Sequence, residues 1–340
     1  MLGAGRGGLE QALLDYVEAL VGEGHPVTAV CHPKWLDRPT LERLPVAIRA
    51  LRSFNEWDPL AARRLRRIVL AGDASAVVTI GRRATSLARL AGSARPIVAV
   101  AQNYSLKPMI GLEHVLATTS DLKRVLIEAG QPAERITVVP NMVRVPPDAA
   151  PPAPEPAPRP VIGALGRFVR KKGFAELIDA LALLQERGVE FTCRIAGDGP
   201  EAGELERRIE ERGLAGRVEL TGWVSDKRAF FDGLDVFCVP SLHEPFGIVV
   251  IEGFAHARAT VVSDAEGPSE IVAGGVDALM VPRGDPGALA EALDRLCQQP
   301  ELRARLAGAA LAKARSTYDL PVVARRLSDT LGEIIRRETG

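Results

Sequence analysis

The sequence predicts an α/β protein built from two doubly wound domains with parallel sheets. Short runs rich in β-branched residues alternate with stretches of helical period, and a proline-rich segment, 146–160, divides the 340-residue chain. A chain of this length can bury two hydrophobic cores. Ligands of such sheets bind beyond the carboxyl ends of the strands, so we expect the site residues in the loops that follow strands.

The expected strands are short and apolar, and each is followed by a segment with helical spacing. In the first half they cover 26–30, 76–80, 96–101, 115–119 and 136–140. In the second half they cover 161–165, 191–196, 217–222, 236–241, 259–263 and 278–282. Helices are expected over 174–186, 286–297, 302–315 and 321–337. This alternation indicates parallel strands joined by helices in both halves.

The segment 146–160 is about half proline. Proline at this density prevents a helix or a central strand, and it favours a semi-rigid polyproline II linker. We therefore expect an N-terminal domain over 1–145, a second domain over 161–320, and a last helical segment over 321–340. The linker would form part of a hinge between the domains.

Composition points to an ordinary globular protein, with 46% hydrophobic and 25% charged residues. The chain contains no run of about 18 apolar residues and no basic N-terminal region leading into a hydrophobic stretch. We therefore expect neither a secreted nor a membrane-spanning protein. The cysteines, Cys31, Cys193, Cys238 and Cys297, are far apart, which favours reduced core thiols in a cytoplasmic protein over a zinc site.

Charge is unevenly distributed along the chain. Through Val145 there are 19 Lys and Arg against 13 Asp and Glu, and after it 24 against 30. The densest basic cluster consists of Arg63, Arg64, Arg66 and Arg67. Such a cluster is either a solvated helix face or a contact surface for anionic lipid headgroups or a phosphorylated glycolipid. No nucleic-acid partner is expected.

Two carboxylates, Glu244 and Glu252, lie eight positions apart around Pro245 and Gly247. Proline suits the first turn of a helix and glycine permits close backbone approach, so we expect a helix to begin near Gly247. At about 100° per residue, both carboxylates can then face one pocket. Two such acceptors suit a polyol, and the free N–H groups at the helix start would attract a phosphate.

Cations follow the strand at 161–165. Gly166 and Arg167 come directly after this strand, and Lys171 and Lys172 follow. Cations beside helix N–H groups can neutralise a diphosphate leaving group without a metal ion. A basic loop that merely opens a helix is the alternative interpretation.

These segments resemble the retaining glycosyltransferases of family 4. EPFGIVVIE (244–252) resembles the E-x7-E motif of that family, and GALGRFVRKKGF (163–174) resembles its diphosphate-binding loop. The resemblance continues through RIAGDGPE (194–201), VVSDAEGPSEIV (261–272), ITVVPNMV (136–143) and GRGGLEQALLDYVEAL (5–20). It implies the GT-B architecture, in which two Rossmann-like domains face a central cleft and the last helix crosses back to the N-terminal domain.

The resemblance also implies roles for residues that match the motifs. Arg167 and Lys172 would bind the donor phosphates, Glu244 the hydroxyls of the transferred sugar, and Glu252 the ribose. Further donor contacts would come from Gly166 and from backbone N–H groups of Phe246, Gly247, Ile248 and Val249. The base would lie near Gly197, Asp198, Trp223 and Val224. Trp223 could equally be a packed core aromatic. No cofactor or metal is expected beyond the nucleotide-sugar substrate.

The N-terminal half departs from the family in two places. Gly7 and Gly8 precede a helix as in the family's glycine loop, which approaches a phosphate or sugar, but only six residues come before Gly7. Either the given start is late, or the sheet lacks a strand that is usually near its centre. Where family members often carry a histidine, after the strand at 96–101, this chain has Gln102. Glutamine can hydrogen-bond a sugar hydroxyl but cannot act as an acid or base.

The expected function is retaining transfer of a sugar from a GDP- or UDP-sugar to a hydroxyl of a glycan or glycolipid. Lipopolysaccharide or other surface-polysaccharide synthesis is the favoured setting, in the cytoplasm or on the inner face of the cell membrane. The main alternative is a catalytically impaired nucleotide-sugar-binding or partner protein of the same fold, although the complete donor-binding set argues against it. A nicotinamide-dependent dehydrogenase is suggested only by Gly3, Gly5 and Gly8, which no strand precedes. A sugar-nucleotide epimerase would not explain the segments 163–174 and 244–252 together.

Overall fold

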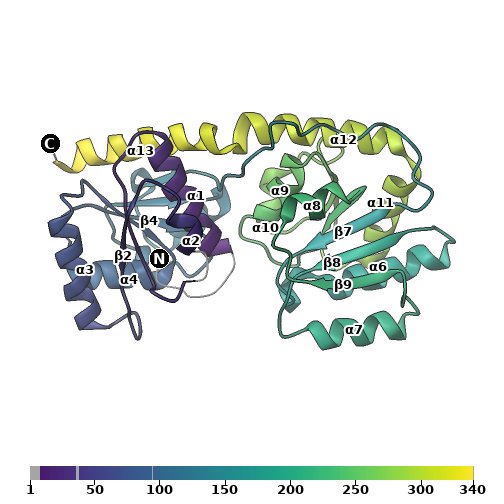
Figure 1. Ribbon diagram of the computed structural model, residues 1–340, viewed down its shortest axis with the longest axis horizontal. Coiled ribbons are helices and arrows are strands. Elements are labelled where there is room, and N and C mark those ends of the chain that lie inside the picture. The colour runs from purple at the N-terminus through teal and green to yellow at the C-terminus, as the bar shows by residue number, and fades with distance from the viewer. Residues whose placement is uncertain (1–7, 36–37, 94, 340) are drawn as a thin grey trace. The chain divides into compact units, whose positions relative to one another are not determined.

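The structure is a computed structural model that describes residues 8–35, 38–93 and 95–339. The chain divides into two compact units. Unit 1 comprises Met1–Met142 and Leu320–Gly340, and unit 2 comprises Val143–Asp319. Each unit contains parallel strands and helices (Figure 1). The predicted α/β class with parallel sheets in two domains is therefore confirmed.

Unit 1 contains two parallel sheets among its described residues. In the first, β1 (Thr28–Cys31) pairs with β2 (Ala47–Ala50). The second is four-stranded, with the order β3-β4-β5-β6. Its strands are β3 (Val77–Ile80), β4 (Ile97–Ala101), β5 (His114–Ala117) and β6 (Ile136–Val138). Residues 1–7, on which the question of the family's first strand turns, lie outside the described part of the chain.

The helices of unit 1 cover both faces of the four-stranded sheet. They are α1 (Gly8–Gly22), α2 (Arg38–Leu41), α3 (Pro59–Ala71), α4 (Arg82–Ala91), α5 (Ser120–Glu128) and α13 (Leu320–Thr339), with 3-10 turns at Lys107–Met109 and Ala133–Arg135. Alternate residues of β4 enter opposite cores because successive strand side chains point to opposite faces. Val98 and Val100 join the core with α1 and α13, whereas Ala99 and Ala101 join the core with α3, α4 and α5.

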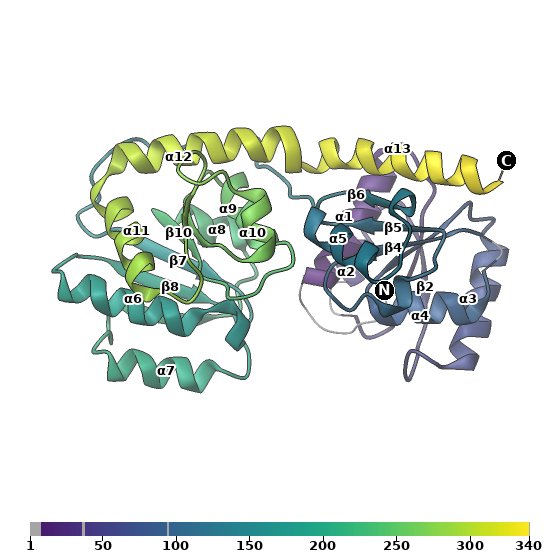
Figure 2. The same cartoon turned by 180° about the vertical axis from the view of Figure 1, so that it is seen from behind.

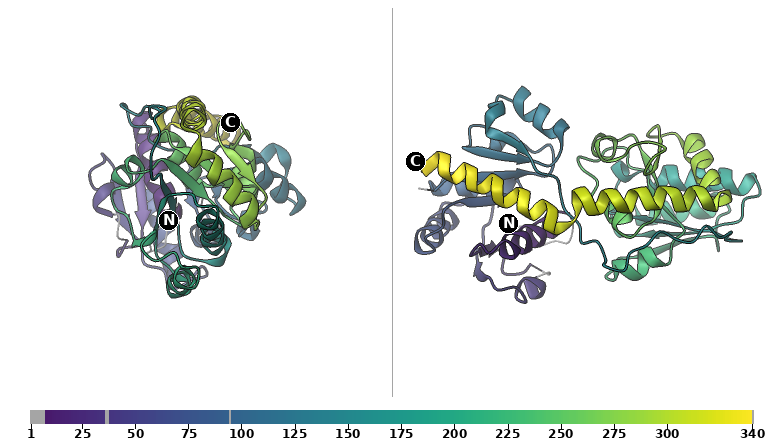
Figure 3. Two further views of the ribbon diagram at one scale, coloured as in Figure 1. Left: turned by 90° about the vertical axis from the view of Figure 1, so that its right-hand side faces the viewer. Right: turned by 90° about the horizontal axis from the view of Figure 1, so that it is seen from above.

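The last helix, α13, packs on α1 of unit 1. Its buried residues Val323, Leu327, Leu331 and Ile334 recur at helical spacing and enter the same core as α1. Figure 3 shows α13, in yellow, beside the purple α1. Residues from the far end of the sequence thus complete one of the two cores of the N-terminal unit.

Unit 2 is built on a six-stranded parallel sheet with the order β12-β11-β10-β7-β8-β9. The strands are β7 (Val161–Leu165), β8 (Thr192–Ala196), β9 (Val218–Gly222), β10 (Val236–Val239), β11 (Ala259–Ser263) and β12 (Leu279–Val281). The chain runs outward from β7 to β9 and then returns to place β10 on the other side of β7. The order of strands therefore reverses between β7 and β10, where ligands of doubly wound sheets bind.

Helices cover both faces of the unit 2 sheet. They are α6 (Phe174–Glu186), α7 (Ala202–Glu211), α8 (Lys227–Asp232), α9 (Ile248–Ala255), α10 (Glu266–Ile271), α11 (Pro286–Gln298) and α12 (Pro300–Lys313). A 3-10 turn spans Arg170–Lys172, and a π-helical turn spans Ala314–Tyr318. Figure 2 shows α11 next to α6; these helices share one core with the sheet. The opposite face packs on α8 and α9 around Phe231, Phe237 and Phe254.

The proline-rich segment 146–160 contains no helix or strand, as predicted, and it belongs to unit 2 along its whole length. Arg228 forms a paired hydrogen bond with Asp148, at 2.8 and 2.6 Å. The buried Arg303 donates to the backbone carbonyls of Leu296 and Glu155, at 2.7 and 3.0 Å. These contacts bind the segment to the body of unit 2, and the boundary between the units falls before it, at Met142 and Val143.

The strands predicted from the sequence are present, with ends that differ by at most two residues. In the part of the chain that the structure describes, the strand that was not predicted is β2 (Ala47–Ala50), whose residues are mostly exposed. All four cysteines are buried and free, as expected of core thiols. Among the described residues, none of the helices combines the length and the apolar character needed to cross a membrane.

Candidate active site

The residues expected to bind the donor follow β7 and β10, the two strands between which the strand order reverses. Gly166 and Arg167 come directly after β7, and Glu244 lies in the loop between β10 and α9. Because parallel strands end at the same edge of a sheet, the fold brings these loops together at the switch point.

Backbone hydrogen bonds join the two loops directly. The carbonyl oxygen of Lys171 accepts from the N–H groups of Leu242 and His243, at 2.8 and 3.2 Å. Gly173, which has φ of 70° and ends the 3-10 turn, makes this approach possible. A Cβ atom there would lie 1.9 Å from the carbonyl oxygen of Pro240, so only glycine fits.

Lys172 and Glu244, one from each loop, form an ion pair between Nζ and Oε2. Their side chains are only 17% and 12% exposed. Partial burial strengthens such a pair relative to one at the surface. Arg167 and Lys171 are exposed, so the structure distinguishes the two neighbouring lysines: Lys172 points at Glu244 and Lys171 does not share that contact.

The backbone of Glu244 is held on both sides by the start of α10. Its N–H donates to Oε2 of Glu266 at 3.1 Å, and its carbonyl oxygen accepts from the N–H of Gly267 at 2.8 Å. Gly267 is required here, since a Cβ atom would lie 2.2 Å from the carbonyl oxygen of Phe246. Glu244 is therefore fixed through its main chain as well as through its ion pair.

Glu266 is a strongly ionised carboxylate. Burial raises its pKa, but hydrogen bonds from its own N–H, from Arg283 and His243, and from the N–H of Glu244 outweigh burial and lower the pKa to about 2. Arg283 Nη1 and His243 Nδ1 lie 2.8 and 3.1 Å from its Oε1. The side chain of His243 is 69% exposed and contacts Glu266, so this histidine supports the loop from outside.

The helix α9 begins at Ile248, as the sequence predicted. Its N-cap, Gly247, has φ of 100° and no side-chain cap hydrogen bond is present there. The N–H groups at the start of this helix, including those of Ile248 and Val249, therefore form the kind of end that attracts an anion. The Phe246 side chain is buried in the core and packs edge-on against Tyr318, so only its backbone is suited to a donor contact.

Glu252 lies one turn further along α9 and is 7% exposed. Its Oε1 lies 2.5 Å from Nζ of Lys227, the first residue of α8. Its Oε2 is buried and has no hydrogen-bond partner among the described residues. The two carboxylates of the motif thus pair with different cations, Glu244 with Lys172 and Glu252 with Lys227.

The other residues expected near the base lie in the loops after β8 and β9. Gly197 has φ of 149°, and a Cβ atom there would lie 1.8 Å from the carbonyl oxygen of Gly166, so the β7 and β8 loops touch. The carboxylate of Asp198 accepts a hydrogen bond within its own loop, from the N–H of Gly199 to Oδ1 at 2.7 Å. Trp223 is 52% exposed, so the packed-core interpretation is wrong. Val224 packs partly against the core of α8 and α9.

In unit 1, Gln102 follows β4 and its Nε2 donates to Oδ1 of Asn141 at 2.7 Å. Asn141 is buried, and its Nδ2 has no hydrogen-bond partner among the residues described. The amide of Gln102 is thereby fixed in one orientation. Gly8 is the first residue of α1. Gly7, with Gly3 and Gly5 of the alternative glycine pattern, lies outside the described residues.

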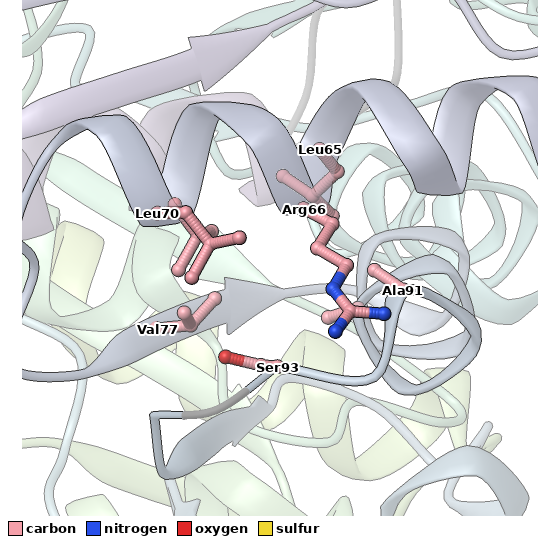
Figure 4. A pocket seen from close by; sticks show the side chains of 8 residues that line it. Leu65, Arg66, Leu70, Val77, Ala91 and Ser93 are labelled. Atoms are coloured by element: carbon pink, nitrogen blue, oxygen red, sulfur yellow. The ribbon is translucent and has the colours of Figure 1, made fainter.

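A small hollow in unit 1 lies away from all of the expected site residues. It is enclosed by α3, α4 and β3, has a volume of about 10 Å³ and is lined mainly by apolar side chains such as Leu65, Leu70 and Val77, with Arg66 beside them (Figure 4). This is the space of about one water molecule, too little for a substrate. No group of three or more potential metal ligands occurs among the described His, Cys, Asp and Glu residues.

Three charged residues of the site were not predicted from the sequence: Lys227, Glu266 and Arg283. Lys227 and Arg283 leave no sequence signal, because their contacts with Glu252 and Glu266 arise only when separate helices and loops pack together. Glu266 lies within the segment 261–272 that resembles the family. Its position in the first turn of α10 was the available signal.

Two family models match adjoining parts of the chain. The model described as glycosyl transferases group 1 matches residues 148–313, and the model described as Glycosyltransferase Family 4 matches residues 6–145. The first range falls in unit 2, and the second falls in unit 1 except for residues 143–145.

Named relatives and solved structures agree with the family models. The lipopolysaccharide core biosynthesis glycosyltransferase LpsD of Rhizobium meliloti (strain 1021) is 37% identical over 61% of this chain and 60% of its own length. LpsE of the same organism is 40% identical over 45% of this chain and 44% of its own length. These matches span less than two thirds of either relative. The crystal structure of Anabaena Alr3699/HepE in complex with UDP and glucose has a TM-score of 0.85 at 21% identity, and the match covers 98% of each chain. The family models and these relatives together show that the chain belongs to glycosyltransferase family 4, with the GT-B fold.

Proposed function

We propose that the protein transfers a sugar from a nucleotide-diphosphate donor to a hydroxyl of a glycan or glycolipid, with retention at the anomeric carbon. One observation carries the proposal: Lys172 and Glu244 meet at the strand-order reversal of unit 2, beside the uncapped start of α9. A cation, a hydroxyl acceptor and free helix N–H groups at one position suit a sugar diphosphate, which offers phosphate oxygens and hydroxyl groups together.

In this proposal the cations act on the leaving group. As the bond between the anomeric carbon and the phosphate oxygen breaks, charge develops on the diphosphate. Lys172, Arg167 and the N–H groups of Ile248 and Val249 would stabilise that charge. The leaving phosphate oxygen then takes the proton of the acceptor hydroxyl, so retention needs no side-chain base. Gln102 could hydrogen-bond a sugar hydroxyl in this scheme but would transfer no proton.

The carboxylates act on hydroxyl groups of the donor. Glu244 would accept from hydroxyls of the transferred sugar, and its fixed main chain would hold that acceptor in place. Glu252 would accept from the ribose, which would satisfy its otherwise unpartnered Oε2. With protein cations neutralising the diphosphate, we propose that transfer requires no divalent metal.

The class of acceptor and the first donor to test are suggested by the relatives. LpsD and LpsE are described as lipopolysaccharide core glycosyltransferases, and we propose a surface-glycan acceptor for this chain as well. The crystallised Anabaena protein binds UDP, which makes a uridine nucleotide the first donor to test.

We further propose that unit 1 contacts anionic lipid through an exposed surface on and before α3. This α3 patch consists of Phe54, Trp57, Leu60, Arg63, Arg64 and Arg67. Phe54 is 86% and Trp57 is 68% exposed, unusual values for large apolar side chains. Aromatic residues beside arginines suit a membrane interface, where the rings enter the headgroup region and the cations bind phosphates.

The loop that carries these aromatic residues is ordered by its own hydrogen bonds. Asp58 caps α3, with Oδ1 accepting from the N–H groups of Leu60 and Ala61, and its Oδ2 accepts from the N–H of Phe54 at 3.1 Å. Asn55 likewise accepts from the N–H of Trp57 at 2.8 Å. The exposed rings are therefore held outward, which lowers the entropic cost of inserting them.

The proposed function is tested by measuring donor binding and turnover together. UDP-glucose, UDP-galactose, UDP-N-acetylglucosamine and GDP-mannose are titrated calorimetrically, and release of nucleotide is followed with and without EDTA. We expect one donor to bind and to be turned over equally well in EDTA. Binding without turnover of any donor, by slow hydrolysis or by transfer to a lipid or glycan acceptor, would favour the impaired nucleotide-sugar-binding protein. Activity that disappears in EDTA and returns with a divalent ion would show that the role given to Arg167 and Lys172 is wrong.

A further inference from the structure

The two oxygens of the Glu252 carboxylate lie in different environments. Oε1 is bound by Lys227 Nζ at 2.5 Å, whereas Oε2 is buried and lacks a donor among the described residues. A buried carboxylate oxygen without a partner is costly, by about 1–3 kcal/mol or more, and native structures rarely leave one. The geometry therefore divides the carboxylate into an oxygen held by the protein and an oxygen left for a ligand.

Lys227 reaches Glu252 from a separate and rigid element. It is the first residue of α8, which Asp226 caps by accepting from the N–H of Ala229 at 2.9 Å. The helix is anchored by Phe231, which is fully buried and packs edge-on against Phe237 of β10 at 5.0 Å between ring centroids. The lysine side chain thus extends from a fixed backbone position, and its side chain is 38% exposed.

Among the described residues, Lys227 is the cation within ion-pair distance of Glu252. Lys172, the other lysine of the site, is paired with Glu244. Without Lys227, the carboxylate would be a buried charge with no counter-ion in the described structure, which would destabilise its present position. The position of Oε2 therefore depends on a residue that lies 25 positions away in the sequence.

We propose that Lys227 is a positioning residue for nucleotide recognition: by binding Oε1, it holds the Glu252 carboxylate in place and orients Oε2 toward a ribose hydroxyl of the donor. This inference rests on the proposed function, since it takes the ligand of Glu252 to be a ribose. Lys227 lies outside the E-x7-E motif. In this proposal, Lys227 and Glu252 act together in recognition of the ribose.

Two other roles for Lys227 lead to different measurements. If the lysine contacted the nucleotide phosphates or base itself, its removal would weaken binding of nucleotides with and without the ribose hydroxyl equally. If the lysine occupied the place of the ribose hydroxyl, its removal would tighten binding. A positioning role instead predicts a loss confined to nucleotides that carry the recognised hydroxyl.

The test uses the full chain and three variants. Lys227→Met removes the cation while keeping most of the side-chain volume, and Lys227→Arg restores a cation. Arg228→Met is the matched control, because Arg228 follows Lys227 on α8 and pairs with Asp148 and Asp232 instead of Glu252. Dissociation constants are measured by calorimetry for UDP and GDP and for their 2′-deoxy and 3′-deoxy analogues, and thermal unfolding confirms that each variant is folded.

For the wild type, we expect loss of the recognised hydroxyl to weaken binding about 10-fold or more, as for a hydrogen bond to a charged group. In Lys227→Met, binding of the unmodified nucleotide should weaken by about the same factor while that of the deoxy analogue stays near the wild-type value. The preference should return in Lys227→Arg and remain in Arg228→Met.

An unchanged preference in Lys227→Met, an equal loss for both nucleotides, or tighter binding would each overturn the positioning role. A wild type that binds UDP or GDP but does not distinguish it from either deoxy analogue would also overturn it, while leaving the proposed sugar transfer in place. A wild type that binds neither nucleotide would overturn the proposed function as well.

Discussion

Lys172 and Glu244, which the sequence assigns to different parts of a donor, form an ion pair with each other across two loops of unit 2. The lysine follows β7 and the glutamate follows β10, so the pair spans the point where the strand order reverses. In the proposed function, the donor would exchange this contact for two others: its diphosphate would take the lysine, and its sugar hydroxyls would take the glutamate. Until then, the ion pair holds both side chains close to the positions in which they would meet the donor.

The two adjacent lysines of the 3-10 turn should differ sharply in function. Lys172→Met removes the cation that pairs with Glu244. Lys171→Met removes an exposed side chain and leaves the Lys171 backbone oxygen, which joins the two loops, in place. We expect Lys172→Met to weaken binding of the tested nucleotide sugar by about 10- to 100-fold and Lys171→Met by less than about 3-fold. Calorimetric titration measures both. Equal losses would mean that the basic loop acts only as a diffuse positive charge.

The contact between Gly267 and Phe246 should be sensitive to a single methyl group. In Gly267→Ala the new Cβ atom would lie 2.2 Å from the Phe246 carbonyl oxygen, so α10 must move away from the Glu244 loop. We expect a loss of about 1–3 kcal/mol in the free energy of unfolding together with weaker nucleotide-sugar binding. Gly308→Ala is the control, because a Cβ atom on α12 meets nothing within 4 Å and should stabilise the helix by about 0.5–1 kcal/mol. Urea denaturation compares the two variants, and a Gly267→Ala protein as stable as the control would contradict the close packing.

The buried His114 should make the stability of unit 1 depend on pH. Burial, and then the charge of Arg337, lower its pKa from 6.5 to about 4. Arg337 Nη2 lies 3.2 Å from Nδ1, and Nε2 lies 2.9 Å from Oγ1 of Thr137, an arrangement that fits a neutral ring. Because the pKa is lowered in the folded state, the unfolded chain binds more protons than the folded protein between about pH 6.5 and pH 4. The contribution of His114 to the free energy of unfolding should therefore be fully present above about pH 6.5 and decline as the pH falls toward 4.

This pH dependence is checked with His114→Asn, which cannot titrate. Urea denaturation of both proteins at several pH values between 7 and 4 gives the slope of the unfolding free energy against pH. We expect the slope for the variant to be smaller, by an amount that corresponds to at most one bound proton, even if the substitution lowers the free energy of unfolding at pH 7. Parallel slopes would show that His114 is protonated in the folded protein in this range.

The α3 patch should bind anionic membranes through its aromatic residues as well as its arginines. We expect the wild type to sediment with vesicles that contain phosphatidylglycerol, and the Phe54→Ser, Trp57→Ser double variant to bind on the order of 10-fold more weakly. Val276→Ser, which replaces a 56% exposed side chain of unit 2, should bind as the wild type does. Binding of the double variant at the wild-type level would show that the aromatic residues do not contribute, and no binding of the wild type would mean that the cluster is only a solvated helix face.

Most of the fold could be predicted from local sequence because many of its strands are largely buried. The segments at 161–165 and 259–263 are short runs rich in apolar and β-branched residues, and they form β7 and β11 with those boundaries. The strand β2 was not predicted because the residues of Ala47–Ala50 are mostly exposed and include Arg49. The segment therefore lacks the apolar pattern that indicates a buried strand.

The site was predictable only where its residues sit in contiguous motifs. Gly247 could be identified because a helix start that approaches a ligand favours glycine, and its φ of 100° fits that expectation. Gly173, with φ of 70°, lies in the segment 163–174 but was not singled out. The pairing of Lys227 with Glu252 could not, since it depends on how α8 and α9 pack on one face of the sheet. The attachment of the segment 146–160 to unit 2 likewise comes from distant arginines, Arg228 and Arg303, that proline content cannot reveal.

In the proposed function, Lys172 and Glu244 serve different parts of one donor, and Glu244→Gln separates their contributions. Calorimetry would measure the affinity of this variant and of the wild type for UDP and for the UDP-sugar that the wild type binds. We expect Glu244→Gln to bind UDP at least as tightly as the wild type, because Lys172 is released from its partner, while the added affinity due to the sugar falls by about 10-fold. A Glu244→Gln protein that loses affinity for UDP itself, or that keeps the full contribution of the sugar, would show that the two residues do not serve separate parts of the donor.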